Sequence, residues 1–175
     1  MKWEEIGDTE CATASALSVI GDRWTLLILR ELSMDSRRFE YIQVQTGMSS
    51  NLLSSRLRRL ERDGIIERRQ YQSSPARFEY FTTNKGKDLD PVLVLLRSCG
   101  LKWRKERSNE EPSVRLWDRE TGDEIGPVFS VGGNAKPFRF DDVTTQVSEA
   151  FASERADRKR SFDEAKARKR IKTQR

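Results

Sequence analysis

The sequence predicts a mainly α-helical (α+β) fold, a winged helix-turn-helix followed by a long helix and a small β appendage. Three features predict it. A helix expected over residues 48–64 has two unlike faces. A shorter helix, closed by Gly47, comes directly before it, and two β-prone runs separated by a polar turn come directly after it. Two helices joined by a tight turn and followed by a hairpin form a winged helix.

The helix over residues 48–64 carries leucines on one face and polar side chains on the other. Leu53, Leu57 and Leu60 recur at helical spacing, which predicts a buried stripe. Ser49 can cap the start of the helix, and Gly64 suits its end. The opposite face holds Asn51, Ser54, Ser55, Arg58 and Arg62. Short polar side chains let a helix approach base edges, and arginines bind guanine or phosphate, so this face favours a DNA-reading helix over a merely solvated one.

The residues before this helix predict further helices. Residues 11–32 have a helical pattern that breaks near Gly21, and Trp24 is expected to anchor the second part in the core. Residues 37–47 predict a short helix whose Ile42 faces inward.

The residues after it predict a wing and a long helix. Strands are expected over 65–71 and 77–82, joined by a loop over 72–76. A long helix then begins after Thr83 and runs to Trp103. Pro91 within it either bends the helix or marks a restart.

The chain is expected to have three parts. Residues 1–107 would form the winged helix-turn-helix domain, with a polar arm at its start. Residues 113–145 would form a small β-rich appendage, and residues 146–175 a basic tail that is helical or disordered. The strands of the appendage are expected at 114–117, 128–131 and 136–140.

The net charge of +5 is unevenly distributed. Residues 153–175 hold ten Lys and Arg against four Asp and Glu, a net +6, which leaves residues 1–152 at −1. Residues 37–71 nevertheless carry eight arginines against four acids, so a local basic patch surrounds the helix of 48–64. The tail's charge favours non-specific nucleic-acid binding, with a solubilising end as the alternative.

Composition excludes several classes of function. The chain has no histidine, which removes every imidazole-dependent mechanism and the commonest metal ligand, so we expect neither an enzyme nor a cofactor or metal site. The acidic start lacks a secretory signal, and apolar runs such as 92–96 are too short to span a bilayer. We expect a cytoplasmic protein without membrane contact.

Four blocks of the sequence resemble the HxlR-type family of bacterial winged-helix transcriptional regulators, relatives of the MarR group. They are LSVIGDRWTLLILREL (17–32, preceded by Cys11), RRFEYIQ (37–43), SSNLLSSRLRRL (49–60) and FEY…TNKG (78–86). The resemblance covers about residues 11–105 and implies a homodimer that binds a specific double-stranded DNA sequence. The dimer would be built from the N-terminal helices and the long helix after the wing.

Two features differ from the family pattern. Ser50 replaces the proline that usually follows serine at the start of the family helix, a small change because proline there is favoured and not required. Some relatives carry paired cysteines in a similar appendage, and residues 113–140 contain none, so no metal role carries over.

We expect DNA contacts from the polar helix face and from two places beside it. The expected contact residues are Ser49, Asn51, Ser54, Ser55 and Arg58 for bases or phosphates, Arg37 and Arg38 for phosphates, and Arg77 for the minor groove or its flanking backbone. The alternative is a winged helix used only for protein contacts, whose exposed helix face would be apolar.

Cys11 is a candidate redox or electrophile switch. It lies at or just before a helix N-terminus, where the dipole and unpaired N–H groups favour the thiolate, although Glu10 opposes it. The resemblance supports this hypothesis, because some HxlR-type proteins sense oxidants with such a thiol. The alternative is a small buried apolar residue. Cys99 is expected to pack within the chain or to pair across a dimer. Any small-molecule effector or oxidant is not specified by the sequence.

Overall fold

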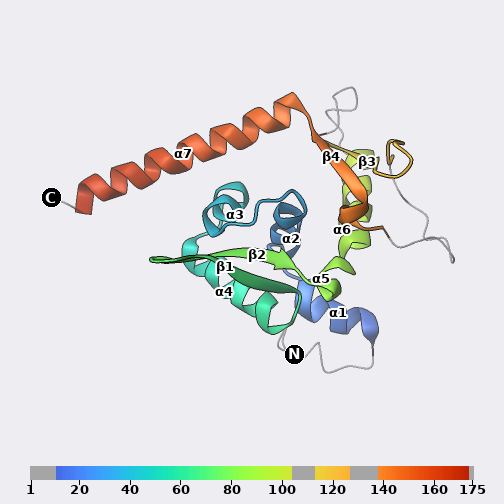
Figure 1. Cartoon of the computed structure of the whole chain (residues 1–175), viewed down its shortest axis with the longest axis horizontal. Helices are drawn as coiled ribbons and strands as arrows, with labels where there is room; N and C mark the ends of the chain where they lie inside the picture. The colour runs from blue at the N-terminus through green and yellow to red at the C-terminus, as the bar shows by residue number, and fades with distance from the viewer. Residues whose placement is uncertain (1–10, 104–112, 127–137, 174–175) are drawn as a thin grey trace. The chain divides into compact units, whose positions relative to one another are not determined.

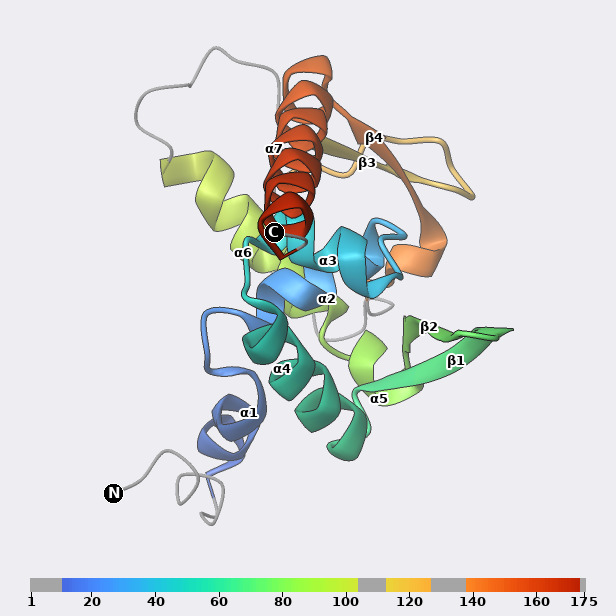
Figure 2. The ribbon, with the colours of Figure 1, turned by 90° about the vertical axis from the view of Figure 1, so that its left-hand side faces the viewer.

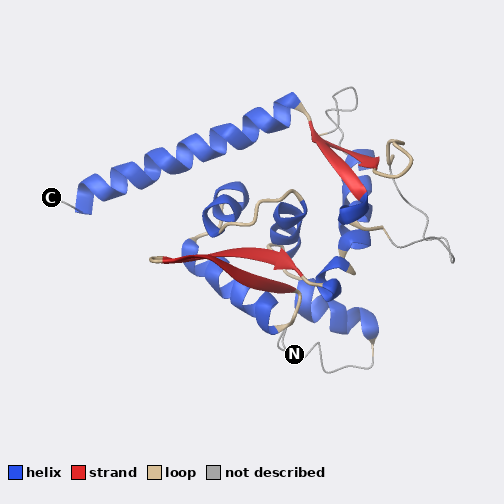
Figure 3. Ribbon diagram, viewed as in Figure 1, coloured by secondary structure: helices blue, strands red, loops and turns tan. Residues whose placement is uncertain are grey.

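A computed structural model describes residues 11–103, 113–126 and 138–173, the side chains of the last five excepted. The chain divides into two compact units, Met1–Lys87 and Asp88–Arg175. The first unit contains α1 (Ala12–Ile20), α2 (Thr25–Ser33), α3 (Phe39–Thr46), α4 (Ser50–Arg62), β1 (Ile66–Ser73), β2 (Ala76–Thr82) and α5 (Asn84–Lys87) (Figure 1). The second contains α6 (Asp90–Trp103), β3 (Val114–Asp118), the 3-10 turn Phe140–Asp142, β4 (Val143–Val147) and α7 (Glu149–Thr173) (Figure 3).

The predicted break between the first two helices is confirmed. The Gly21 N–H donates to the Leu17 carbonyl at 2.7 Å and ends α1. The Asp22 carboxylate accepts from the backbone N–H groups of Trp24 and Thr25 at 2.8 and 3.1 Å, which places a negative charge at the start of α2. Trp24 is only half-buried, with the Arg23 guanidinium 5.6 Å from its ring, so the prediction of a core tryptophan was wrong.

The core of the first unit lies between α2, α3, α4 and β1. The predicted leucine stripe of α4 is confirmed, since Leu53, Leu57 and Leu60 are 0–2% exposed. Burying one such side chain stabilises the fold by about 1.5–3 kcal/mol. They pack in a core that also contains Ile28, Leu29, Leu32, Ile42 and Ile66. On α1 only Ile20 is buried, and Leu17 is 42% exposed.

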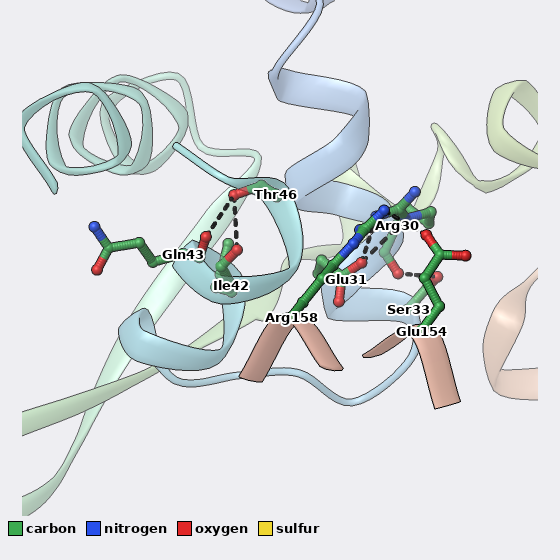
Figure 4. A network of polar contacts seen from close by, with 8 residues as sticks. All are labelled: Arg30, Glu31, Ser33, Ile42, Gln43, Thr46, Glu154 and Arg158. Atoms are coloured by element: carbon green, nitrogen blue, oxygen red, sulfur yellow. Dashed lines mark hydrogen bonds and ion pairs between the residues drawn. The ribbon is translucent and has the colours of Figure 1, made fainter. Parts of the chain in front are cut away.

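A tight turn joins α3 to α4. Gly47 ends α3 at φ +70, a left-handed conformation that glycine adopts without a steric penalty. The Thr46 hydroxyl donates to the Ile42 carbonyl at 2.7 Å in the last turn of α3 (Figure 4). At the end of α2, the Arg30 guanidinium contacts the Glu31 carboxylate at 2.6 Å, and Ser33 Oγ donates to the Arg30 carbonyl. The helices are therefore closed by local polar contacts.

The wing is an antiparallel hairpin of β1 and β2 (Figure 2). Its register runs from Ile66 opposite Thr82 to Ser73 opposite Ala76, with an irregularity between Gln70 and Gln72. The predicted loop over 72–76 was too long, because only residues 74–75 lie between the strands. The chain before α3 also joins this sheet, since the Tyr80 N–H donates to the Arg37 carbonyl at 2.9 Å.

The expected long helix is divided into α5 and α6. Its restart at Asp90 places Pro91 in the first turn, where its missing N–H costs no helical hydrogen bond. Gly86 on α5 packs closely against the backbone of Ile65, because a Cβ there would lie 2.1 Å from the Ile65 carbonyl oxygen. Of the two predicted alternatives, Pro91 therefore marks the restart of a helix and not a bend within one.

In the second unit, α6 packs with the β appendage. Val94, Leu116 and Val143 form its buried cluster, with Val114, Ile125, Phe138 and Phe140 partly buried against it. The Arg97 guanidinium donates to the Val114 carbonyl at 2.7 Å, and burial lowers the pKa of Arg97. β3 confirms the strand predicted at 114–117 and pairs antiparallel with β4, which was not predicted.

Other predictions for the C-terminal half have mixed outcomes. The strand expected at 128–131 lies outside the described residues, as do 136–137, and residues 138–140 form no strand. The tail is helical over α7, the first of the two alternatives. The three-part division at 107 and 145 stays a prediction, although contacts group α6 with the appendage and not with the helix-turn-helix.

Candidate nucleic-acid interface

α4 turns a polar stripe to solvent because its leucines are buried on the other side. Asn51, Ser55, Arg58 and Arg62 are all exposed and follow one another at helical spacing. Ser54 is half-buried at the edge of this stripe. We call the four exposed residues the outer stripe of α4.

The start of α4 is fixed by hydrogen bonds from two elements. The Ser49 hydroxyl accepts from the Leu52 N–H at 3.3 Å and caps the helix, as predicted. From α3, Gln43 Nε2 donates to the Met48 carbonyl at 3.2 Å and to Ser50 Oγ at 2.8 Å. The residue that replaces the family proline therefore ties α3 to α4. These bonds set the angle at which α4 leaves the turn.

The arginines of α4 divide into two kinds. Arg59 Nη2 donates to the Ser18 carbonyl of α1 at 2.6 Å, and Arg56 Nη1 lies 3.6 Å from the Asp22 carboxylate. Both side chains are about one quarter exposed. The Arg58 side chain, by contrast, makes no hydrogen bond or ion pair with other residues that the structure describes. Two arginines thus hold the helix in the fold, and Arg58 is available to a ligand.

A shallow depression borders the outer stripe on the side of the α1–α2 corner. Four arginines and one carboxylate line it, which gives the surface a net charge of +3. The lining residues are Gly21, Asp22, Leu52, Ser55, Arg56, Arg58, Arg59 and Arg62. Such a surface attracts phosphate oxygens. The sequence did not reveal that Asp22 and Arg56 contribute to it, because neither lies on the predicted polar face.

The arginines before α3 stack on aromatic rings of the wing. The Arg37 guanidinium lies 4.5 Å from the Phe81 ring, and Arg69 lies 4.3 Å from the same ring. Arg37 also contacts the Asp35 carboxylate at 2.6 Å. Arg38 donates to Glu79 at 2.9 Å, a bond that raises the pKa of Arg38. Both predicted residues are therefore anchored within the first unit, beside the wing.

Arg77 lies near the wing tip and is exposed. Its side chain makes no hydrogen bond or ion pair with the described part of the chain. A cavity of about 520 Å³ between α3 and the wing brings Arg77 and Arg38 to one hollow, with aromatic walls that include Tyr71 and Tyr80. Burial raises the pKa of Tyr80. The predicted wing arginine and one of the predicted arginines before α3 thus border the same surface.

Two wing arginines were not among the contact residues predicted from the sequence. Arg68 and Arg69 are exposed on β1, and Arg68 lies 4.8 Å from the Phe78 ring and 3.1 Å from Glu61. Their alternation with aromatic residues of β2 was visible, but only the strand pairing places each guanidinium over a ring.

Both cysteines are exposed. Cys11 is the N-cap of α1, with its backbone extended at ψ 106, and its carbonyl accepts from the Ser15 N–H at 3.0 Å. The alternative of a buried apolar residue is therefore wrong for Cys11. Cys99 lies on α6 and is exposed too, so its predicted packing within the chain was wrong.

The described residues offer neither a metal site nor a membrane-spanning helix. No cluster of three or more metal-ligating side chains occurs among them. None of the helices in this part of the chain has the length and apolar character needed to cross a membrane.

The helix-turn-helix, wing and long helix match a known family. A family model described as HxlR-like helix-turn-helix matches residues 19–108. The chain belongs to the HxlR-like helix-turn-helix family. The members of this family are transcriptional regulators, as the resemblance implied.

Relatives of this HxlR-like chain include regulators and solved structures. An uncharacterised HTH-type transcriptional regulator, Rv3095 of Mycobacterium tuberculosis (strain ATCC 25618 / H37Rv), is 38% identical over 112 residues, which cover 64% of this chain and 70% of that protein. The crystal structure of PA1607, a candidate transcription factor, is 30% identical with a TM-score of 0.62 and covers 85% of this chain and 99% of its own. The structure of the redox regulator HypR in its reduced form is 27% identical with a TM-score of 0.50. The match covers 56% of this chain and 98% of the HypR chain.

Proposed function

We propose that this protein is a transcriptional regulator that binds a specific double-stranded DNA sequence as a homodimer. One observation carries the proposal. The outer stripe of α4 combines short polar side chains at Asn51 and Ser55 with exposed arginines at Arg58 and Arg62. This chemistry suits base edges in the major groove, where arginine binds guanine and asparagine binds adenine. Phosphate contacts from Arg37, Arg38 and the wing would fix the register.

Exposed apolar side chains support a homodimer. Leu17 on α1 is 42% exposed, and Leu96 and Trp103 on α6 are 49% and 71% exposed. Leu96, Cys99 and Trp103 recur at spacings of three and four residues, so they share one face of α6. Water-exposed apolar faces of this kind favour association between copies of the chain. A two-fold dimer would place two α4 helices in successive major grooves about 34–36 Å apart, on a pseudo-palindrome.

The alternative, a winged helix used only to bind proteins, would require an apolar exposed face on α4. The outer stripe contains no apolar residue. Its serine, asparagine and arginine side chains therefore favour DNA over a protein groove.

Footprinting on the DNA upstream of the protein's own gene and its neighbours tests the proposal. We expect a protected site with two half-sites one helical turn apart. Arg58→Ala should weaken binding to that site by about 1–3 kcal/mol while leaving the unfolding midpoint unchanged. The matched control is Arg160→Ala, an equal loss of charge on α7. No protected site on any of these fragments, or equal affinities for wild type and Arg58→Ala, would contradict it.

We further propose that Cys11 makes DNA binding responsive to oxidants or electrophiles. Its exposure at the N-cap of α1 leaves the thiol accessible. An oxidant such as diamide accepts two electrons and two protons as two thiols form a disulfide, and Cys99, exposed on α6, can supply the second thiol across a dimer. The similarity to HypR supports this proposal.

The thiol proposal has its own test. Diamide treatment should change the footprint of the wild type and leave that of Cys11→Ser unchanged. Mass spectrometry should find Cys11 modified in the same sample. An unaltered affinity together with an unmodified Cys11 rejects the switch without affecting the DNA-binding proposal.

A further inference from the structure

α7 carries its charges on separate faces. Successive residues of a helix advance by about 100°, so the angular position of each described side chain follows from its number. Four cations and two aromatic rings fall within an arc of about 100° that contains no acidic residue. This basic face of α7 consists of Arg155, Arg158, Lys159 and Lys166, with Phe151 and Phe162 between them.

The acidic residues lie elsewhere on the helix. The face opposite the basic face holds three carboxylates, Glu149, Asp157 and Glu164, together with the remaining described cations, Arg160 and Arg168. Glu154 and Asp163 flank the basic face on its two sides. Helix stability does not require cations and carboxylates to lie on separate faces, because i,i+4 ion pairs form wherever opposite charges are one turn apart.

Contacts within α7 orient the cations of the basic face. Arg155 lies 5.7 Å from the Phe151 ring, and Lys166 lies 5.9 Å from the Phe162 ring. Arg158 and Lys159 contact the flanking carboxylates Glu154 and Asp163 (Figure 4 shows the first pair). A guanidinium has five N–H donors and can contact more than one anion at once.

We infer that the basic face of α7 binds the phosphate backbone of double-stranded DNA without reading its sequence. From Arg155 to Lys166 the face extends about 16 Å along the helix, which spans about five phosphates of one strand. The final seven residues of the sequence add four Lys and Arg and no acidic residue, so positive charge continues toward the end of the chain. A row of repeated cations suits a polyanion whose negative charges are evenly spaced, such as the phosphate backbone of DNA.

Two features favour DNA over a membrane surface. A membrane-binding helix needs an apolar face that inserts between lipids, and the described basic face offers only two phenylalanines among its cations. The inference rests on the proposed function for the identity of the polyanion, since a regulator held at its operator by α4 has duplex DNA on either side. α7 would then increase the residence time of the protein on DNA without changing the operator that α4 selects.

The test compares two full-length variants with equal loss of charge. Arg155→Ala/Arg158→Ala removes two arginines from the basic face, and Arg160→Ala/Arg168→Ala removes two from the other faces. Each variant loses at least one ion pair within α7, so circular dichroism should report similar helix content for both. The probe is a 30-base-pair duplex of random sequence, titrated by fluorescence anisotropy between about 50 and 200 mM salt.

We expect the basic-face variant to bind the duplex roughly tenfold more weakly, with a salt slope smaller by up to about 2. The control should match the wild type within about twofold. Equal losses in both variants would overturn the inference, and so would unchanged binding in both. Binding to phosphatidylglycerol vesicles but not to the duplex would also overturn it, in favour of a membrane.

The two proposals fail in distinguishable ways. If the basic-face variant keeps the operator footprint and loses only random-duplex affinity, both hold. If the wild type gives no footprint but the two arginine pairs still differ on random duplex, the sequence-reading function fails and the backbone contact stands.

Discussion

α4 and α7 both carry rows of arginines, but the structure supports them differently. α4 buries Leu53, Leu57 and Leu60 in the core and is tied to α1 through Arg59. α7 carries no fully buried apolar side chain among its described residues, and ion pairs join its own neighbouring turns. A helix fixed within a domain presents each side chain at a defined place, which base reading requires. A helix held by its own side chains can contribute charge, but it does not fix which base a cation meets.

The largest expected difference between these helices is in folding. Leu57→Ala removes a fully packed side chain and should lower the free energy of unfolding by about 2–5 kcal/mol. Phe162→Ala on α7 should lower it by less than about 1 kcal/mol, because the ring is only partly buried. Urea unfolding followed by circular dichroism measures both. Similar losses would show that α7 is as deeply packed as α4.

A second prediction separates two arginines that are adjacent on α4. Arg59→Ala removes the bond to the Ser18 carbonyl and should lower the free energy of unfolding by about 1–3 kcal/mol. Arg58→Ala removes no described contact and should leave it unchanged within about 0.5 kcal/mol. Thermal denaturation of the two variants gives the comparison. A less stable Arg58→Ala would mean that this side chain also supports the fold.

The turn before α4 gives a third, smaller effect. Gly47→Ala places a side chain at φ +70, which should cost about 1 kcal/mol although nothing lies within 4 Å of the added carbon. DNA affinity should fall by no more than the lower fraction of folded protein, measured by urea unfolding, explains. Gly100→Ala, a glycine in helix α6 without positive φ and equally open, is the control and should not destabilise.

The smallest effect concerns the ion pairs of α7. Glu154→Ala removes an ion-pair partner of Arg158 and should cost about 0.3–0.5 kcal/mol of helix stability. Removing a flanking carboxylate also raises the net charge beside the basic face, so random-duplex affinity should rise by about two- to fivefold at low salt. Glu164→Ala, on the other side of the helix, should change duplex affinity less. Fluorescence anisotropy at two salt concentrations measures the duplex affinity of the Glu154→Ala and Glu164→Ala variants.

Much of the first unit could be predicted from local pattern. The leucine spacing located α4, Gly47 and Ser49 located the turn, and alternation in residues 65–82 located the wing. These signals act within a few residues of the chain, where period and capping rules apply.

What the sequence could not supply was the partner of each side chain. Arg59 and Ser18 are separated by 41 residues, and Arg38 and Glu79 by the same number. The helical period places Arg58 on the polar face and Arg59 off it, but it does not reveal that Arg59 bonds the Ser18 carbonyl and holds the fold. β4 was missed for a similar reason, because the short run of residues 143–147 forms a strand through pairing with β3.

The most direct test of the proposed reading helix is selection of duplexes from a randomised library by wild type and by Arg58→Ala. We expect the wild type to select a pseudo-palindrome and Arg58→Ala to lose preference at one or two base pairs in each half-site, with the remaining positions retained. The Arg155→Ala/Arg158→Ala variant should select the same sequence as the wild type. An identical site selected by Arg58→Ala, or no preference in the wild type, would contradict the assignment of sequence reading to the outer stripe of α4.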